Sequence, residues 1–419
     1  MKIACVVHRF GPDIAGGSEG HCLQVARRLA AAHDVTVLTT CARDHVTWRN
    51  EYRPGPATID AGRGRTGAPA QLGVERFRVA RERSTRRFAE ISSRVFDRRA
   101  PIAEQEQWFR ENGPESPALV DALASRGSAF DRILFWSFRY YQTFFGLPLV
   151  ADRALLLPTA EDDAVIRLGV LDRFFSLPAG FIFLTPEEQD LVARRSSRPL
   201  APSSVVGCGV DPARPAPGAA RLLDALHVAR PFALYLGRVD PNKGCDTLLR
   251  SFQRIHAEAR AACPRLVMAG PANMALPKDA PWLTALGQVD AALREALLSH
   301  ASVLIVPSLY ESLSMVLIEA WNHGVPALVN GRCAALRGQA IRSGGALYYR
   351  NVDEFVHALA LLFDDRDAAR HIGAQGLAYV EREYRWPQVM DRIEARLRSP
   401  LTPALPPGTA RSAEPSAPA

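Results

Sequence analysis

Lysine is scarce in this sequence of 419 residues, and long apolar runs are missing from it. Only Lys2, Lys243 and Lys278 are lysines, so arginine supplies nearly all of the 51 basic residues. No apolar run approaches the roughly 18 residues that span a bilayer, and the run at 3–7 is too short for a signal peptide. The sequence therefore argues against a membrane-spanning protein, and we expect a cytoplasmic one.

Cysteine spacing excludes two further classes of protein. The seven cysteines are odd in number, scattered and free of C-x-x-C spacing. This pattern argues against a disulfide framework or a zinc site and is typical of a reducing cytosol. With 47% hydrophobic and 23% charged residues, the composition is that of a globular protein, and the length indicates two or three domains.

Positive charge is in excess, with a net charge of +7 that is densest from Arg76 to Arg99. Such a patch fits an anionic lipid surface, a phosphate-bearing acceptor or nucleic acid. Because no nucleic-acid-binding motif accompanies it, we expect no nucleic-acid partner. Peripheral contact with an anionic membrane is one interpretation of the patch, and a solvated helix surface is the other.

The same order of elements occurs twice along the chain. The first unit is strand 3–7, a glycine-containing loop, helix 18–32 and strand 35–39. The second unit begins with strand 232–236 and ends with strand 265–269. Each is a β-loop-α-β unit, which requires a parallel sheet with a right-handed crossover. Two such units so far apart predict an α/β protein with two Rossmann-like domains.

We expect the domain boundary in a proline-rich stretch near residue 203. The amino-terminal domain would cover 1–203, with an irregular or helical insertion at about 43–127. The carboxy-terminal domain would cover 204–385, and helix 386–398 would cross back to the first domain. The tail at 399–419 has too few large apolar residues to order itself, so we expect it to be disordered.

A glycine-rich loop follows the first strand. Gly16 and Gly17 permit close approach of a ligand to the backbone, and Ser18 is a good N-cap for the helix that follows. The free N–H groups and partial positive charge of that helix end suit phosphate. A glycine-rich turn before a helix is also common without any ligand, so an anion site and a plain turn both stay open.

The loop after strand 232–236 carries two cations, Arg238 and Lys243. It joins the carboxyl end of a strand to the start of a helix, which is where open α/β sheets bind ligands. The guanidinium offers a fork of donors to phosphate oxygens, and the ammonium is a compact point charge. Together they could neutralise a diphosphate leaving group. A solvated basic turn is the alternative.

Residues 303–333 are the most informative segment, and they indicate strand 303–306, loop 307–313, a helix from about 314 to 323 and strand 327–330. Glu311 lies in the loop, and Glu319 lies eight positions later in an otherwise apolar helix. A carboxylate among apolar residues is costly to bury unless it is paired, and two ribose hydroxyls would satisfy Glu319. The N–H groups that begin this helix, which could hold sugar or phosphate oxygens, belong to Ser312, Leu313 and Ser314.

Taken in order, these motifs resemble the family 4 glycosyltransferases with the GT-B fold. The resemblance rests on the Glu311-x7-Glu319 pair, the loop 237–244 and the loop with Gly16 and Gly17. Three further segments agree with it, at 183–188, 207–211 and 286–290. It covers residues 1–398, most strongly 200–380. It implies two Rossmann-like domains that face each other across a cleft.

The resemblance also implies roles for the charged residues. Arg238 and Lys243 would grip the diphosphate of a nucleotide sugar, and Glu319 would hold the ribose. Glu311 would address the donor sugar, together with the N–H groups that follow it.

The remaining implied contacts come from backbone. Gly287 and Val289 would line the base pocket, and Gly17, beside Gly16, would touch the phosphates or sugar from the opposite domain. The family retains anomeric configuration and needs no bound metal or cofactor. In agreement, the donor segments contain no Asp-x-Asp motif or histidine cluster.

One position departs from the family. Members commonly carry a histidine that faces the transferred sugar, and we align Glu161 with it. Glu161 could accept hydrogen bonds from the sugar or stabilise positive charge at the anomeric carbon. It could not supply a neutral N–H donor. Of the run 161–163, we expect Glu161 and Asp162 in the cleft, and an exposed acidic turn is the alternative.

The resulting prediction is a retaining glycosyltransferase that uses a UDP- or GDP-sugar. Its acceptor would be a glycan, a lipid-linked molecule or another hydroxyl compound, in cell-surface polysaccharide or glycolipid synthesis. A GT-B epimerase or phosphorylase is an alternative, although no epimerase acid/base set or cofactor lysine is identifiable. A non-catalytic sugar-nucleotide-binding protein is the other alternative, motivated by Glu161.

Overall fold

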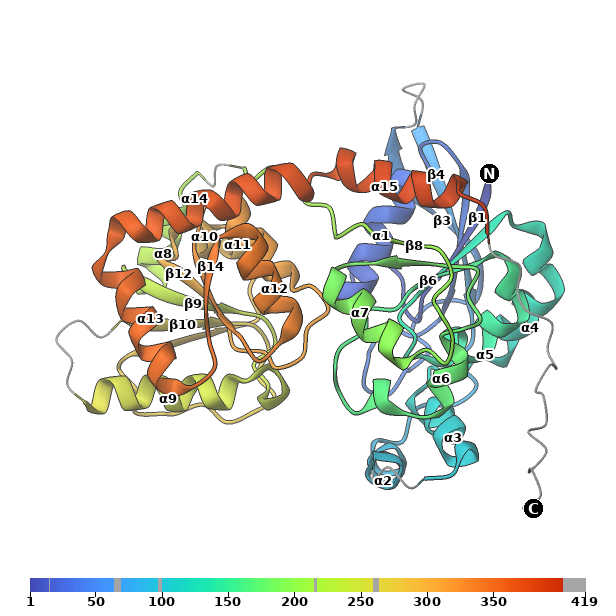
Figure 1. The fold of residues 1–419 in the computed structure, drawn as a ribbon, viewed down its shortest axis with the longest axis horizontal. Helices are drawn as coiled ribbons and strands as arrows, with labels where there is room; N and C mark the ends of the chain where they lie inside the picture. The colour runs from blue at the N-terminus through green and yellow to red at the C-terminus, as the bar shows by residue number, and fades with distance from the viewer. Residues whose placement is uncertain (15, 64–68, 97–99, 215–216, 259–263, 402–419) are drawn as a thin grey trace, which may run out of the picture.

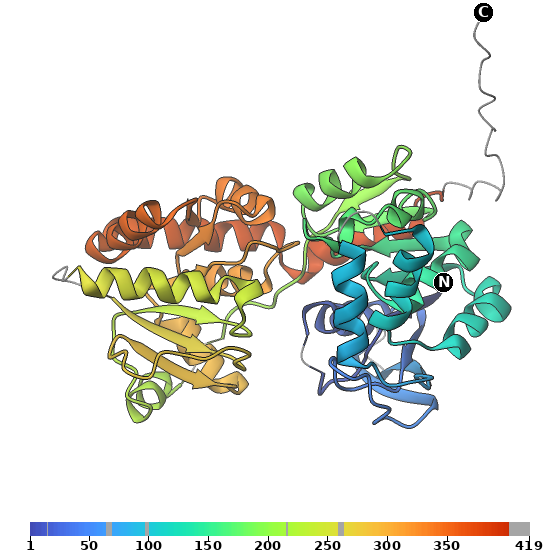
Figure 2. The same ribbon diagram turned by 90° about the horizontal axis from the view of Figure 1, so that it is seen from below.

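A computed structural model describes residues 1–14, 16–63, 69–96, 100–214, 217–258 and 264–401. The chain forms two α/β lobes that lie side by side (Figures 1 and 2). One lobe is built on an eight-stranded sheet and the other on a six-stranded sheet. The predicted class, with two parallel α/β sheets, is confirmed. Residues 402–419, most of the tail that we expected to be disordered, lie outside the described residues.

The amino-terminal sheet has the order β3-β4-β2-β1-β5-β6-β7-β8 and is parallel except for the antiparallel pair β3 and β4. Its strands are β1 (Lys2–Val6), β2 (Asp34–Thr40), β3 (Gly55–Arg63), β4 (Pro69–Phe77), β5 (Arg132–Trp136), β6 (Ala154–Leu157), β7 (Gly180–Phe183) and β8 (Ser203–Val205). Its α-helices are α1 (Gly17–Leu29), α2 (Thr85–Phe96), α3 (Ile102–Asn112), α4 (Pro117–Arg126), α5 (Tyr141–Gly146), α6 (Val170–Phe174) and α7 (Pro186–Arg195).

The segment 43–127, for which we expected irregular or helical structure, also supplies the strands β3 and β4. In β4, Ala70, Leu72 and Val74 are buried at every second position. That is the period of a strand with one face on the core. The many Gly, Pro and Arg residues around it conceal this short alternation in the sequence. The helices α2, α3 and α4 follow, as the helical part of the expectation requires.

The carboxy-terminal sheet is parallel, with the order β11-β10-β9-β12-β13-β14. Its strands are β9 (Phe232–Leu236), β10 (Arg265–Ala269), β11 (Leu283–Gly287), β12 (Val303–Val306), β13 (Ala327–Asn330) and β14 (Ala346–Tyr349). Its α-helices are α8 (Ala219–Ala225), α9 (Cys245–Ala257), α10 (Ala291–His300), α11 (Met315–Asn322), α12 (Ala334–Ser343), α13 (Val352–Asp364) and α14 (Arg366–Glu383).

Central strands of both sheets are apolar runs without alternation. All residues of β6, β7 and β12 are buried. Parallel strands with helices on both faces have this composition. Each sheet accordingly has an apolar cluster on either side.

The last helix, α15 (Trp386–Arg398), runs from the carboxy-terminal lobe onto the amino-terminal lobe (Figure 1). Its apolar side, with Val389, Ile393 and Leu397, packs in the cluster that contains Ile3 and Cys5 of β1 and the apolar face of α1. This burial anchors the helix to the first sheet, although the chain before it belongs to the second.

Two chain segments therefore join the lobes, and they run together. The N–H of Val210 donates to the carbonyl of Tyr384 at 2.7 Å. Side chains at Gly207 and Gly209 would collide with the rings of Tyr384 and Trp386, respectively. Glycine at these two positions lets the aromatic rings lie directly on the connecting backbone. We refer to residues 206–211 and 384–386 as the hinge.

Candidate active site

The carboxyl ends of the two sheets meet at a cluster of charged side chains. Lys243 closes the short 3-10 helix η4 (Pro241–Lys243), which follows β9. Its Nζ lies 2.8 Å from Glu311 Oε1, in the loop after β12, and 4.0 Å from Glu161 Oε1, after β6. One ammonium thus faces a carboxylate from each lobe. Burial opposes its charged form, but Glu311 and Glu161 outweigh burial and raise the pKa of Lys243.

Glu161 has a second cationic partner, Arg139, which sequence reasoning did not identify. Arg139 follows β5 and lies 3.3 Å from Glu161 and 2.6 Å from Asp163. Burial raises the pKa of Glu161, with Glu311 adding to the rise and the two cations opposing it. No local pattern pairs residues 139 and 161, because only the adjacency of β5 and β6 brings them together.

Asp162 does not join this cluster. Its carboxylate is 3.0 Å from Arg167, and its side chain is 62% exposed. Of the acidic run, the structure brings Glu161 to Lys243 and Asp163 to Arg139, whereas Asp162 turns toward Arg167.

Arg238 lies beside Lys243 in the same loop. Its side chain is 41% exposed, and its Nε is 3.5 Å from Asp240, so its guanidinium has donors left for a ligand. The loop is held close to the end of β12, because a side chain at Gly244 would collide with the carbonyl of Pro307. Gly244 also has a φ of +76°, which favours glycine.

The loop before α11 also reaches across to the other lobe. The hydroxyl of Thr185, which caps α7, donates to the carbonyl of Ser312 at 2.9 Å. Leu313 is buried, and Ser314 has a φ of +74° at the N-cap of α11. A left-handed conformation in a residue other than glycine is strained, and such strain is frequent at functional sites. The expected donor loop is therefore held between the lobes.

Glu319 is paired rather than free. It lies on α11 with a side chain that is 20% exposed, and it forms an ion pair with Arg294 of α10. Burial raises the pKa of Glu319, and the attraction of Arg294 opposes that rise. Sequence reasoning missed Arg294, because it precedes Glu319 by 25 residues on a separate helix and only the packing of α10 beside α11 brings the two side chains together.

The predicted base-pocket residues lie at the end of β11 and in the short loop that leads to α10. Gly287 ends the strand with a φ of +63°, and no atom stands within 4 Å of where its Cβ would be. Val289 is half-buried against the core. Asp290 then caps α10 by accepting from the N–H of Leu293 at 2.8 Å. The open space at Gly287 leaves its backbone accessible.

In the glycine loop, the structure corrects the expected cap. Gly16 is the N-cap of α1, and Ser18 lies inside the helix. A side chain at Gly16 would collide with the carboxylate of Glu19, whereas Gly17 has open space around it. Glycine at 16 is thus required by Glu19, and Gly17 is the position that a ligand could approach.

Glu19 is the centre of a buried network that sequence reasoning missed. His8 Nε2 lies 3.0 Å from Glu19 Oε1, and Arg9 donates to the same oxygen. Tyr140 stacks on His8 with ring centroids 3.7 Å apart. Burial opposes ionisation of Glu19, but the charges and hydrogen bond of His8 and Arg9 prevail and lower its pKa to about 2. The network fixes the backbone after β1 against the start of α1.

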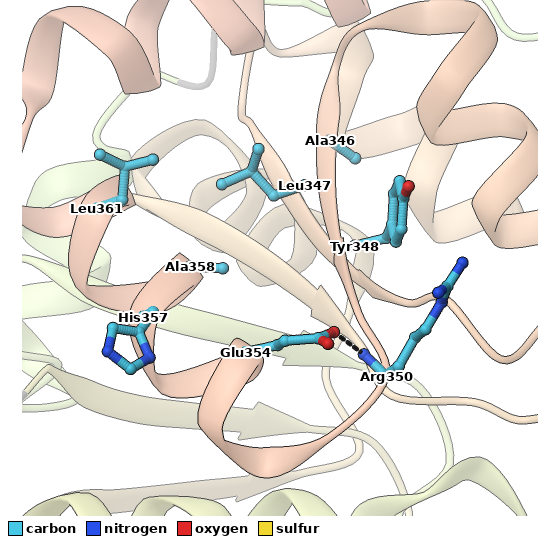
Figure 3. Close-up of a pocket in the computed structure, with 8 residues that line it drawn as sticks. All are labelled: Ala346, Leu347, Tyr348, Arg350, Glu354, His357, Ala358 and Leu361. Atoms are coloured by element: carbon cyan, nitrogen blue, oxygen red, sulfur yellow. Dashed lines mark hydrogen bonds between the residues drawn. The ribbon is translucent and has the colours of Figure 1, made fainter.

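Two hollows lie elsewhere, and one of them is on the outer part of the carboxy-terminal lobe. It has a volume of about 590 Å³ and is lined by β14 and α13, including Tyr348, Arg350 and His357 (Figure 3). A smaller cavity of about 350 Å³ lies by the hinge and includes Gly207 and Tyr384. Neither is lined by a predicted site residue. The cluster at Lys243 is therefore the better candidate on chemical grounds.

Within the described residues, no group of three or more His, Cys, Asp or Glu side chains is arranged to hold a metal ion. No helix in the same part of the chain is long and apolar enough to cross a membrane.

The fold is that of known two-domain glycosyltransferases. Sucrose-phosphate synthase from Thermosynechococcus elongatus superposes with a TM-score of 0.69 at 17% identity, covering 95% of this chain and 98% of that one. Anabaena HepE in complex with UDP and glucose superposes with a TM-score of 0.64 at 13% identity, covering 95% and 99%. At these identities the likeness shows the fold alone, and the predicted GT-B fold is confirmed.

Sequence matches cover a smaller part of the chain than the structural superpositions do, and they are to a family of transferases. Residues 230–365 match the model of the family described as "Glycosyl transferases group 1". A D-inositol 3-phosphate glycosyltransferase from Nocardia farcinica is 28% identical over 194 residues, 42% of this chain and 43% of that protein. A GDP-mannose-dependent phosphatidylinositol monomannoside mannosyltransferase from Mycobacterium tuberculosis is 30% identical over 183 residues, 40% and 48%. The aligned regions span less than half of these curated relatives.

Proposed function

We propose that the chain is a glycosyltransferase that moves a sugar from a nucleotide-diphosphate sugar to an acceptor hydroxyl. The observation that carries the proposal is Lys243, which stands between Glu311 and Glu161 where the two sheets face each other. The family match over residues 230–365 and the names of the relatives support the same class.

In the proposed reaction, the diphosphate of the donor forms ion pairs with the Lys243 ammonium and the Arg238 guanidinium. As the bond from the sugar to the diphosphate breaks, negative charge grows on the leaving oxygen, and two fixed cations stabilise it. Glu311, released from Lys243, would then accept hydrogen bonds from the sugar. Glu319 would accept from the ribose, and backbone at Gly287 and Val289 would border the base.

Several finer points belong to the proposal. The donor would be a UDP- or GDP-sugar, the configuration at the anomeric carbon would be retained, and no metal would be required. The acceptor would be a glycan or a lipid-linked molecule, in cell-surface polysaccharide or glycolipid synthesis. The mannosyltransferase relative, which is GDP-mannose-dependent by name, favours a lipid-linked acceptor.

Contact with an anionic membrane is a further part of the proposal, and α2 is the element that supports it. Its residues Arg86, Arg87 and Arg94 are exposed, and Arg86 and Arg94 have only long ion pairs of 3.9 and 3.8 Å to glutamates. Arg76 is buried, and Arg81 lies 2.9 and 2.7 Å from two glutamates. Arg98 and Arg99 lie outside the described residues. Flotation with anionic vesicles at low salt should recover the protein, and R86A/R87A/R94A should abolish the recovery. Wild-type protein that stays at the bottom of the gradient would end this part of the proposal.

The main experiment is a thermal-shift series with UDP, GDP, ADP and their sugar conjugates, without added metal. A ligand at about 100 times its dissociation constant stabilises the fold by roughly 2.7 kcal/mol. One nucleotide family should shift the melting temperature, and Lys243→Ala should remove the shift. Arg250→Ala, which changes an exposed arginine of α9, is the matched control and should keep it. A series with no shift would contradict the proposal.

Glu311→Ala separates an enzyme from a non-catalytic binding protein. If the chain is a transferase, release of free nucleotide diphosphate from the donor should fall on the order of 100-fold in this variant, as for the loss of one stabilising group. If purified wild-type protein binds the donor but releases no nucleotide with any glycan or lipid acceptor, the binding alternative suggested by Glu161 is the better description.

A further inference from the structure

The charged groups around the proposed sugar position alternate in sign from one lobe to the other. In order they are Asp163, Arg139, Glu161, Lys243 and Glu311, with successive separations of 2.6, 3.3, 4.0 and 2.8 Å. The first three belong to the amino-terminal lobe and the last two to the carboxy-terminal lobe. Three carboxylates thus share two cations, so with all five groups ionised the cluster carries one net negative charge.

The balance changes when a donor binds. The following step rests on the proposed function, in which Lys243 pairs with the diphosphate instead of with Glu161 and Glu311. The three carboxylates then share Arg139 alone, and Arg139 already lies closer to Asp163 than to Glu161. Glu161 and Glu311 are both mostly buried, and water therefore screens their charges only weakly. With Lys243 paired to the diphosphate, the two carboxylates need hydrogen-bond donors from the bound sugar.

A sugar ring that bears hydroxyl or amino groups provides such donors, whereas a ring that bears a carboxylate brings a like charge. We infer that this site takes nucleotide sugars whose sugar carries no anionic group and excludes nucleotide-linked uronic acids. Like charges placed together at a binding site cost enough to weaken binding by about 100-fold or more. Glu161 from one lobe and Glu311 from the other are the residues that impose this selection.

The selection depends on position rather than on total charge. The donor's diphosphate is itself anionic, and Arg238 and Lys243 are placed to receive it. Glu161 and Glu311 flank Lys243, which in the proposed function binds the diphosphate to which the sugar is attached. A general repulsion of anions would weaken UDP and its uronic acid conjugate equally, whereas the site proposed here weakens the conjugate alone.

The test uses pairs of donors that differ only in the oxidation of C6. Isothermal titration calorimetry with the full chain compares UDP-glucose with UDP-glucuronic acid, and GDP-mannose with GDP-mannuronic acid. UDP and GDP serve as references for the nucleotide alone. UDP-glucuronamide and its GDP-linked mannose counterpart, which match the acids in size but are uncharged at C6, separate charge from shape.

One of the two nucleotides, UDP or GDP, should bind. For that nucleotide, the conjugates with the hexose and with the uronamide should bind about 100-fold more tightly than the conjugate with the uronic acid. Glu161→Gln should reduce that ratio about tenfold. Glu106→Gln removes an exposed carboxylate of α3 and should leave the ratio unchanged.

Each other outcome contradicts a defined part of the reasoning. Equal affinity for hexose and uronic acid would overturn the inference while leaving the proposed function intact. Equal exclusion of uronamide and uronic acid would mean that shape, not charge, selects the donor. A ratio unaffected by Glu161→Gln would remove Glu161 from the explanation. If no nucleotide or conjugate binds, the proposed function itself fails. Should Glu161→Gln not fold, the uronamide comparison on wild-type protein still decides the point.

Discussion

Arg294 gives a sharp test of how the proposed nucleotide site works. Its guanidinium pairs with the carboxylate of Glu319, which lies on α11 among apolar neighbours. We regard Arg294 as a positioning residue that keeps Glu319 ionised and correctly turned. Replacement by alanine would leave Glu319 buried without that cation, and burial already raises its pKa. A larger fraction of Glu319 would then be protonated at neutral pH.

The loss of nucleotide affinity expected in Arg294→Ala can be estimated from the hydrogen bond that Glu319 would make to the ribose. A hydrogen bond to a charged group contributes about 1.5 to 3 kcal/mol, and one such bond to the ribose would be weakened in Arg294→Ala. Binding of the preferred nucleoside diphosphate should therefore weaken about 10- to 100-fold at neutral pH. Arg294→Lys keeps a positive charge and should lose less.

The pH dependence distinguishes this reasoning from general damage. Because a carboxyl ionises as pH rises, the Glu319 carboxylate of Arg294→Ala should recover as the pH is raised from neutral into the alkaline range. The ratio of variant to wild-type dissociation constants should fall over that range. Calorimetric titrations with UDP and GDP measure it, with Arg250→Ala as the surface control.

Two results would refute this account of Arg294. Tighter binding by Arg294→Ala would mean that Arg294 competes with the ligand for Glu319. A defect of constant size at every pH would mean that Arg294 supports packing rather than ionisation.

Three further predictions concern stability. Glu188→Ala would leave two buried backbone N–H groups without their side-chain carboxyl acceptor, at a cost of about 2 to 5 kcal/mol. Calorimetry should show a clearly lowered melting temperature, whereas Glu187→Ala, which removes an ion pair near the surface, should cost under about 1 kcal/mol. The pKa of Glu19 is lowered to about 2, so the stability that its ionised form contributes to the fold is complete above its ordinary pKa and is lost as pH falls toward 2. Glu19→Gln should therefore be less stable than wild type at pH 7, and the difference in stability should shrink in acid. Gly209→Val should drive a side chain into Trp386 and lower the melting temperature, and an unchanged value would contradict the close packing of the hinge.

Local pattern predicted the strands well where they are apolar and central. The expected strands 232–236, 303–306 and 327–330 coincide with β9, β12 and β13. Each is a short apolar run between turn residues, and such a run can be recognised in the sequence without a structure. The strands β3 and β4 were missed, because an antiparallel pair at the edge of a sheet has a weaker pattern among Gly, Pro and Arg.

The candidate site divides in the same way. Lys243, Glu311 and Glu319 could be chosen from the sequence, because a charge in a strand-to-helix loop or in an apolar helix is unusual wherever it occurs. Their partners Arg139 and Arg294 could not be chosen. Each lies on an element whose neighbour is set by sheet order or helix packing, and spacing along the chain does not report either.

By itself, then, the sequence determined the kind of secondary structure, the two parallel sheets and the charged loops at their carboxyl ends, since these follow from short-range periodicity and residue chemistry. Only the tertiary structure decided that Glu161 meets Lys243 and that Glu319 is held by Arg294. Those contacts depend on how the hinge sets one lobe against the other and on how α10 packs beside α11. Such long-range packing arises from the whole buried surface and not from any single segment.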